Sequence, residues 1–274
     1  MNFVKRILSR VQFKSKKYAI LFWVNVKAQF AYRGIVLEVV FDYIMELILL
    51  LLLWRAIYGD NQILYGRSFS QMKGYLIASC TISYFFSYPS IQFLSLDIRN
   101  GEIAYTLIKP IDFQVQFFFK CLGRTVSYMI IVLPMCIIFA RLSGATSSGN
   151  WIFAVASLLT GVIICICFDF FLGIICFWTE NSWGIALARQ VVLQYLSGAF
   201  VPLDCFPTQF TVIFRDYLPF SGIVYFPVQF ATCAYTFSYF LNRMLLQTVW
   251  CLVFIILGRI LYLIAKKKTF VNGG

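Results

Sequence analysis

A short charged segment, residues 95–113, reads SLDIRNGEIAYTLIKPIDF and lies between two strongly apolar runs. Its charged residues are Asp97, Arg99, Glu102, Lys109 and Asp112, although only 12% of the whole chain is charged. A chain that crosses a lipid bilayer needs polar connections of this kind, because irregular backbone is not tolerated against lipid. We therefore expect residues 95–113 to connect two membrane spans outside the bilayer.

The composition of the chain indicates an integral membrane protein that carries no recognisable catalytic, metal-binding or nucleotide-binding motif. Hydrophobic residues make up 61% of the 274 residues, against about 45–50% in soluble domains. Histidine is absent, which removes the commonest general base and metal ligand. The nine cysteines form no C-x-x-C pair, and no G-x-x-x-x-G-K-[ST] motif occurs. We predict no enzymatic activity, no metal site and no cofactor on this chain.

Apolar runs of about 20 residues, the length needed to cross a bilayer, predict an all-α protein with six transmembrane helices. The expected spans are residues 35–57, 72–95, 114–140, 151–178, 183–201 and 244–265. Between the last two spans, residues 202–243 hold four of the seven prolines. Closely spaced prolines break a helix repeatedly, so we expect two short, re-entrant helices there. A seventh span across residues 221–240 is the alternative.

Lysine and arginine predict which side of the membrane the chain ends occupy. Residues 1–34 carry eight basic residues and no acidic one, and the tail begins with Lys266, Lys267 and Lys268. With both termini cytoplasmic, the inner segments hold 14 basic residues and the outer segments six, as the positive-inside rule requires. The predicted domains are thus a cytoplasmic basic segment at 1–34, a membrane domain at 35–265 and a cytoplasmic tail at 266–274.

The N-terminal segment is too polar through residue 17 to be a cleaved signal peptide. Residues 18–33, YAILFWVNVKAQFAYR, mix aromatic and basic residues at a density typical of a helix lying in the membrane interface. A plain basic flank to the first span is the alternative. Gly34 is the predicted elbow between this helix and the span.

Charged residues also occur inside the predicted spans. Glu38, Asp42 and Glu46 are spaced four residues apart and so lie along one face of the first span. Arg124 and Asp169 are expected at comparable depths in the third and fourth spans. Because intramembrane charges usually face a protein interior or a water-filled cavity, we predict that Arg124 and Asp169 face protein and pair. For the acidic stripe, structural ion pairs, the polar wall of a substrate cavity and a proton relay remain alternatives.

Cys205 and Cys233 are the two cysteines outside the six predicted spans, and both fall in the predicted exterior region. An oxidising exterior permits a disulfide between them. Two unrelated thiols are the alternative, since the sequence does not fix their separation.

Three motifs resemble the permease subunits of ABC type-2 exporters. They are the Gly-Glu-Ile…Lys-Pro pattern within residues 95–113, Leu-Trp-Arg-Ala-Ile-Tyr at 53–58, and Tyr-Leu-Pro-Phe…Tyr-Phe-Pro-Val-Gln at 217–229. The resemblance implies that two such permeases pair and that separate ATPase subunits, which carry ATP and Mg, dock against them. It also implies a coupling loop after the second span that contacts the ATPase. The residues assigned to this loop are Asp97, Arg99, Gly101, Glu102, Lys109 and Pro110.

The function that the resemblance implies is ATP-driven export across the bacterial cytoplasmic membrane. The 19% aromatic content favours an amphipathic substrate such as a peptide, a lipid-linked molecule or a drug-like compound. A channel, a secondary carrier and a non-transporting membrane scaffold are the alternatives, and an ordinary solvated connection is the alternative for the coupling loop. No internal repeat of the kind found in secondary carriers is visible.

Overall fold

A computed structural model describes residues 2–102, 111–144, 148–179 and 182–269. The chain is almost entirely helical, apart from one two-stranded antiparallel hairpin in which Ile63 pairs with Ser68. The elements are α1 (Asn2–Ala31), α2 (Arg33–Tyr58), β1 (Ile63–Leu64), β2 (Arg67–Ser68), α3 (Phe69–Tyr84), α4 (Ser90–Arg99), α6 (Phe113–Ser143), α7 (Trp151–Ile175), α8 (Trp183–Leu196), α9 (Thr208–Val212), α10 (Tyr225–Thr232) and α11 (Phe237–Thr269).

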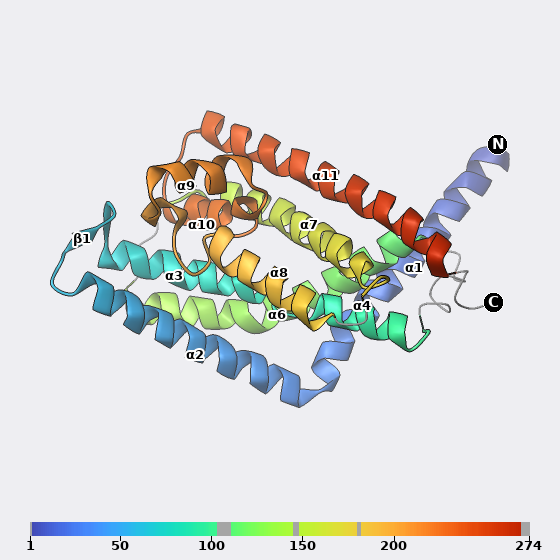
Figure 1. The fold of residues 1–274 in the computed structure, drawn as a ribbon, viewed down its shortest axis with the longest axis horizontal. Coiled ribbons are helices and arrows are strands. Elements are labelled where there is room, and N and C mark those ends of the chain that lie inside the picture. The colour runs from blue at the N-terminus through green and yellow to red at the C-terminus, as the bar shows by residue number, and fades with distance from the viewer. Residues whose placement is uncertain (1, 103–110, 145–147, 180–181, 270–274) are drawn as a thin grey trace.

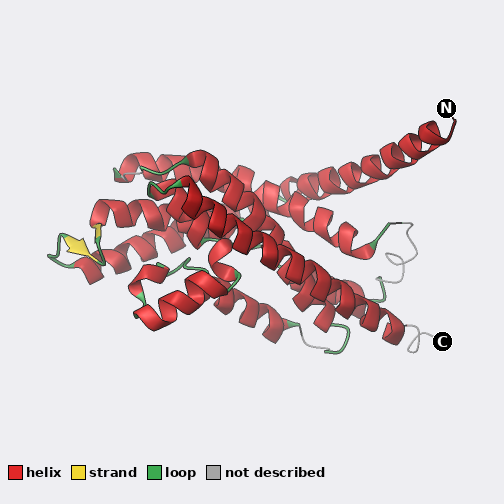
Figure 2. Ribbon diagram, turned by 90° about the horizontal axis from the view of Figure 1, so that it is seen from above, coloured by secondary structure: helices red, strands yellow, loops and turns green. Residues whose placement is uncertain are grey.

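The long helices form an elongated bundle with two distinct ends (Figure 1). The β1–β2 hairpin and α9 lie at one end, which we call the hairpin end. The start of α1 and the end of α11 lie at the other, which we call the terminal end, and α1 projects from the bundle there (Figure 2). The start of α1 and the end of α11 therefore lie on the same side of the bundle.

Three helices in the described part of the chain are long and apolar enough to cross a membrane, namely α6, α7 and α11. They correspond to the predicted spans at 114–140, 151–178 and 244–265. Helix α2 has 26 residues and matches the predicted first span closely. Its acidic stripe and its two arginines leave at least three charged residues in every 18-residue window of α2, whereas each of the other three helices has a window with two or fewer.

The predicted span at 72–95 is wrong as one continuous helix. Helix α3 ends at Tyr84 and α4 begins at Ser90. Pro89 lacks a backbone N–H and disfavours helical backbone at the residue before it, so the chain breaks over residues 85–89. The buried Phe86 carbonyl freed by this break accepts a hydrogen bond from the Arg189 side chain at 2.9 Å.

The predicted span at 183–201 is also shorter than expected. Helix α8 has 14 residues and is about 21 Å long at ~1.5 Å per residue. It ends just before Gly198, whose φ of +80° is a left-handed conformation that glycine adopts without strain. The Gly198 carbonyl accepts a hydrogen bond from the Tyr75 hydroxyl at 2.7 Å, which fixes the end of α8 against α3.

The proline-rich segment at the hairpin end is broken into several short helical elements rather than the two that were predicted. Besides α9 and α10, it contains helical turns at Leu203–Cys205, Ile213–Tyr217 and Phe220–Gly222. The turn at 203–205, α9 and the turn at 220–222 each begin directly after a proline, namely Pro202, Pro207 and Pro219. The turn at 213–217 follows α9 without a gap. Helix α10 ends in extended backbone at Cys233, so no continuous helix crosses residues 221–240.

Close helix contacts depend on small residues. A side chain on Gly123 of α6 would place its Cβ 2.6 Å from the Phe22 carbonyl oxygen of α1. The Ser127 hydroxyl, one turn later, donates to the Val26 carbonyl at 3.3 Å. The second half of α1 thus packs directly on α6. The elbow between α1 and α2 is at Tyr32, which has extended backbone, and not at Gly34 as predicted.

Candidate functional site

The segment predicted to contact an ATPase lies at the terminal end of the bundle. Arg99, Gly101 and Glu102 are exposed there. Helix α4 ends at Arg99, and Gly101 turns the chain with a φ of +73°, a conformation that favours glycine. Lys109 and Pro110 lie outside the described residues. Arg99 and Glu102 therefore both present exposed surface at this end of the bundle.

Ion pairs behind this segment connect the helices of the terminal end. Asp97, one of the residues assigned to the coupling loop, bonds to Lys120 of α6 at 3.1 Å and is partly buried. Asp112 caps the first turn of α6, since its Oδ1 accepts from the backbone of Gln114 at 3.0 Å. Its Oδ2 also pairs with Arg259 of α11 at 2.5 Å. These ion pairs therefore connect the end of α4 to α6, and the start of α6 to α11.

The predicted pair between Arg124 and Asp169 is wrong. Asp169 of α7 is fully buried and pairs with Arg189 of α8 through two hydrogen bonds, at 2.8 Å from Nε and 3.0 Å from Nη2. The Ser90 hydroxyl, at the start of α4, donates to the same carboxylate at 2.6 Å. The Arg124 guanidinium instead lies over the Phe93 ring, 4.0 Å from its centroid. Asp169 does face protein, as predicted, but its partner is Arg189 rather than Arg124.

The sequence does contain a signal for this pair. Arg189 is the single charged residue between positions 183 and 201. Asp169 lies six residues before the end of α7, and Arg189 lies six residues after the start of α8. Two helices joined by a short connection place such residues at matching depths, so Arg189 is the geometrically favoured partner. Arg189 is one of the 14 basic residues counted above on the inner side, although it lies within the expected span at 183–201.

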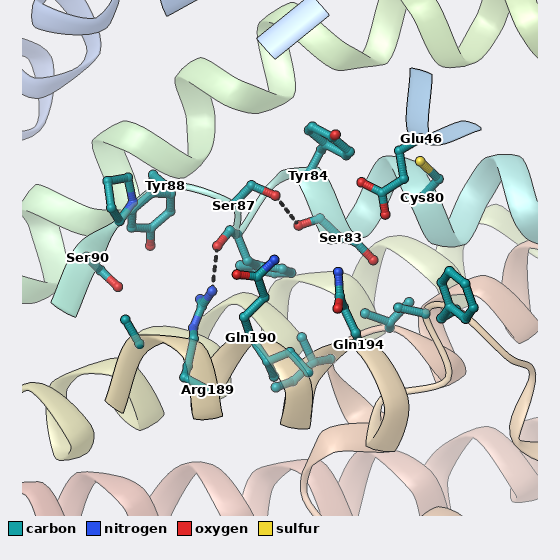
Figure 3. A pocket seen from close by; sticks show the side chains of 18 of the residues that line it. Glu46, Cys80, Ser83, Tyr84, Ser87, Tyr88, Ser90, Arg189, Gln190 and Gln194 are labelled. Carbon is teal, nitrogen blue, oxygen red and sulfur yellow. Dashed lines mark hydrogen bonds between the residues drawn. The ribbon is translucent and has the colours of Figure 1, made fainter. Parts of the chain in front are cut away.

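The ion pair borders a polar cavity of about 280 Å³ inside the bundle. The cavity is lined by α2, by the break between α3 and α4, by α8, and by residues 199–200 and 223–224 (Figure 3). Its polar lining residues are Asp42, Glu46, Ser83, Tyr84, Ser87, Tyr88, Ser90, Gln92, Arg189, Gln190 and Gln194. In the close-up, Glu46 points in from α2 while Gln190 and Gln194 point in from α8.

The predicted acidic stripe divides into two parts. The exposed Asp42 and the half-buried Glu46 line the cavity, whereas Glu38, which is also exposed, does not belong to the lining. Neither Asp42 nor Glu46 forms an ion pair within the described residues. This arrangement favours the cavity-wall interpretation of the stripe over structural ion pairs.

A second polar cluster at the hairpin end has no counterpart among the predicted residues. Asp204 accepts hydrogen bonds from Arg67 at 2.8 Å, Tyr225 at 2.5 Å and Gln229 at 2.9 Å. Burial lowers the pKa of Arg67, but the Asp204 carboxylate and other neighbours outweigh it, so this pKa is raised. The cluster ties the β1–β2 hairpin to the proline-rich segment. The Cys205 and Cys233 thiols are both free in this segment.

Comparison with known proteins identifies the family. No curated protein matches the sequence. A family model described as "ABC-2 family transporter protein" matches residues 44–270, which include the exposed end of α4, the cavity break and the Asp169–Arg189 pair. The match spans most of the chain, and the membrane helices described above agree with it. The chain therefore belongs to the ABC-2 family of transporter proteins and is a multi-pass membrane permease of this type.

Proposed function

We propose that this chain is the transmembrane subunit of an ATP-driven exporter in the bacterial cytoplasmic membrane. It pairs with a second permease and with separate ATPase subunits, and it moves an amphipathic substrate outward. The observation that carries this proposal is membership of the ABC-2 transporter family over residues 44–270. The terminal end is assigned to the cytoplasm because the basic residues of α1 and of the tail gather there.

The geometry supports a route from an ATPase contact to the cavity. Helix α4 has ten residues and so spans about 15 Å. One end carries the exposed Arg99, and the other end carries Ser90, which bonds to Asp169 at the border of the cavity. Movement of α4 as a rigid body would reach α7 and α8 through the Asp169–Arg189 pair. This is a mechanical link of the kind that domain motions use.

Helix α8 supports pairing with a second permease. No residue of α8 is buried within the chain. Trp183, Leu187, Val191 and Tyr195, spaced four residues apart, present one exposed apolar face. Because α8 also forms a wall of the cavity, a second permease seated on this face would close the cavity from that side.

Co-purification with a soluble ATPase tests the proposal. The tagged chain, expressed with the ATPase subunits of its host, is expected to retain one of them and to show ATP hydrolysis. Glu102→Lys reverses a charge at the exposed end of α4 and should weaken this association or uncouple hydrolysis from transport. Asp60→Lys makes the same change at an exposed position of the hairpin end, and it should leave both unchanged.

The opposite results would support an alternative function. Transport that continues without ATP would indicate a secondary carrier or a channel. Equal behaviour of the Glu102→Lys and Asp60→Lys variants would remove the end of α4 from the ATPase contact.

A further inference from the structure

We propose that the cavity binds the cationic head group of an amphipathic substrate, with Asp42 and Glu46 as its charge partners. This inference rests on the proposed transport function and specifies its substrate class. The cavity, at about 280 Å³, is at the lower limit of the ~300–1,000 Å³ typical of small-molecule pockets. It therefore suits a head group rather than a whole drug-sized molecule.

The balance of charge in the cavity favours a cation. The charged lining residues are Asp42, Glu46 and Arg189. The Arg189 charge is neutralised by Asp169, which lies behind it at 2.8 Å. Asp42 and Glu46 have no basic partner within the described residues, so the cavity carries an excess of negative charge. Uncompensated carboxylates at membrane depth are costly, and a bound cation would compensate them.

The hydrogen-bonding groups of the cavity suit the same ligand. Gln190 and Gln194 point into the space from α8 and face Glu46 of α2 across it (Figure 3). Neither amide forms a hydrogen bond elsewhere within the described residues. Amide and carboxylate oxygens are acceptors for an ammonium or guanidinium group. An anionic head group would instead meet two carboxylates at close range and be repelled.

Apolar side chains beside the cavity could accommodate the tail of the substrate. Met45 and Leu49, three residues after Asp42 and Glu46 respectively, are 42% and 61% exposed on α2. Leu193 of α8 and Phe200 belong to the apolar part of the cavity lining itself. A substrate with its head between Asp42 and Glu46 would lay its tail along these helices. This arrangement satisfies both parts of an amphipathic cation.

A binding measurement on the full-length permease in phosphatidylcholine nanodiscs tests this inference. The probes are a dansyl-labelled dodecylammonium and a dansyl-labelled dodecylsulfonate, which have the same tail and opposite head charges. We expect fluorescence anisotropy to report saturable binding of the ammonium probe and at least tenfold weaker binding of the sulfonate. Asp42→Asn and Glu46→Gln should each weaken the ammonium probe about tenfold, equivalent to ~1.4 kcal/mol.

Glu38→Gln is the matched control, because it removes a carboxylate from the same helix one turn away and outside the cavity lining. It should change ammonium binding less than twofold. Equal binding of the two probes by the unaltered protein, or equal effects of Glu38→Gln and Glu46→Gln, would overturn the inference. The comparison of the ammonium and sulfonate probes uses the unaltered protein, so this comparison does not depend on whether a variant folds. Binding of the probe to the permease requires no ATPase. A failure of the proposed ATP-driven transport would therefore be detected in the separate co-purification and transport experiment.

Discussion

The buried pair between Asp169 and Arg189 gives the sharpest stability prediction. Asp169 has no exposed surface, and the Arg189 side chain is only 11% exposed. Arg189→Leu would leave a buried carboxylate with the Ser90 hydroxyl alone. Removing one partner of a buried ion pair costs about 3–5 kcal/mol. We expect Asp169→Leu to cost a similar amount, because it leaves a guanidinium that is only 11% exposed without its carboxylate partner.

The double variant, Asp169→Leu with Arg189→Leu, should be less damaging than the sum of the two. It removes both charges and leaves the Phe86 carbonyl and the Ser90 hydroxyl without their partners, at about 1–3 kcal/mol for each unsatisfied group. The total loss should therefore lie at least ~2 kcal/mol below the sum of the single losses. The assay is equilibrium unfolding of the purified protein in mixed micelles, followed by helical circular dichroism.

A control cycle uses Arg124, the partner that the sequence had suggested. Arg124→Leu removes a cation–π contact with Phe93, worth about 0.5–2 kcal/mol. Its effect should add to that of Asp169→Leu within ~0.5 kcal/mol. Additive losses for Asp169 with Arg189, together with strong coupling of Asp169 to Arg124, would refute this assignment of the ion pair.

Three further predictions concern helix packing, the hairpin end and the orientation of the chain. Gly123→Ala should destabilise the protein by about 1–3 kcal/mol, because its Cβ would meet the α1 backbone at 2.6 Å. In the same unfolding assay Gly34→Ala, which meets nothing within 4 Å, should cost nothing. Asp204→Ala should lower the free energy of unfolding by about 2 kcal/mol, because Arg67 and two further donors lose their acceptor. An unchanged free energy of unfolding would exclude a stabilising role for this cluster. A membrane-impermeant thiol reagent applied to intact cells should label Thr236→Cys and miss Asn100→Cys, and the reverse pattern would invert the proposed orientation.

Much of the fold follows from hydrophobic length and from proline. The apolar runs predict α6, α7 and α11 because lipid-facing and core-facing residues are both apolar in a membrane helix. Pro202, Pro207 and Pro219 predict a segment of short elements because each removes a backbone donor. These features depend on local sequence alone.

The break between α3 and α4 and the true partner of Asp169 were harder to predict. Residues 85–89 are nearly as apolar as the helices on either side, so hydropathy alone does not reveal the break. Pro89 indicates an interruption of the helix. The break is also held by the hydrogen bond from Arg189 to the Phe86 carbonyl, and these two residues are 103 positions apart. Likewise, Asp204 contacts Arg67 across 137 positions. Contacts between distant residues become predictable only once the packing of the helices is known.

The central claim is that the end of α4 contacts an ATPase, and site-specific photo-crosslinking tests it most directly. A photoreactive residue is placed at Glu102 in one variant and at Thr208, in the first turn of α9 at the hairpin end, in another. Each is expressed in intact cells together with the ATPase subunits. We expect an ATP-sensitive crosslink to the ATPase from Glu102 and none from Thr208. A crosslink from Thr208 without one from Glu102 would contradict it.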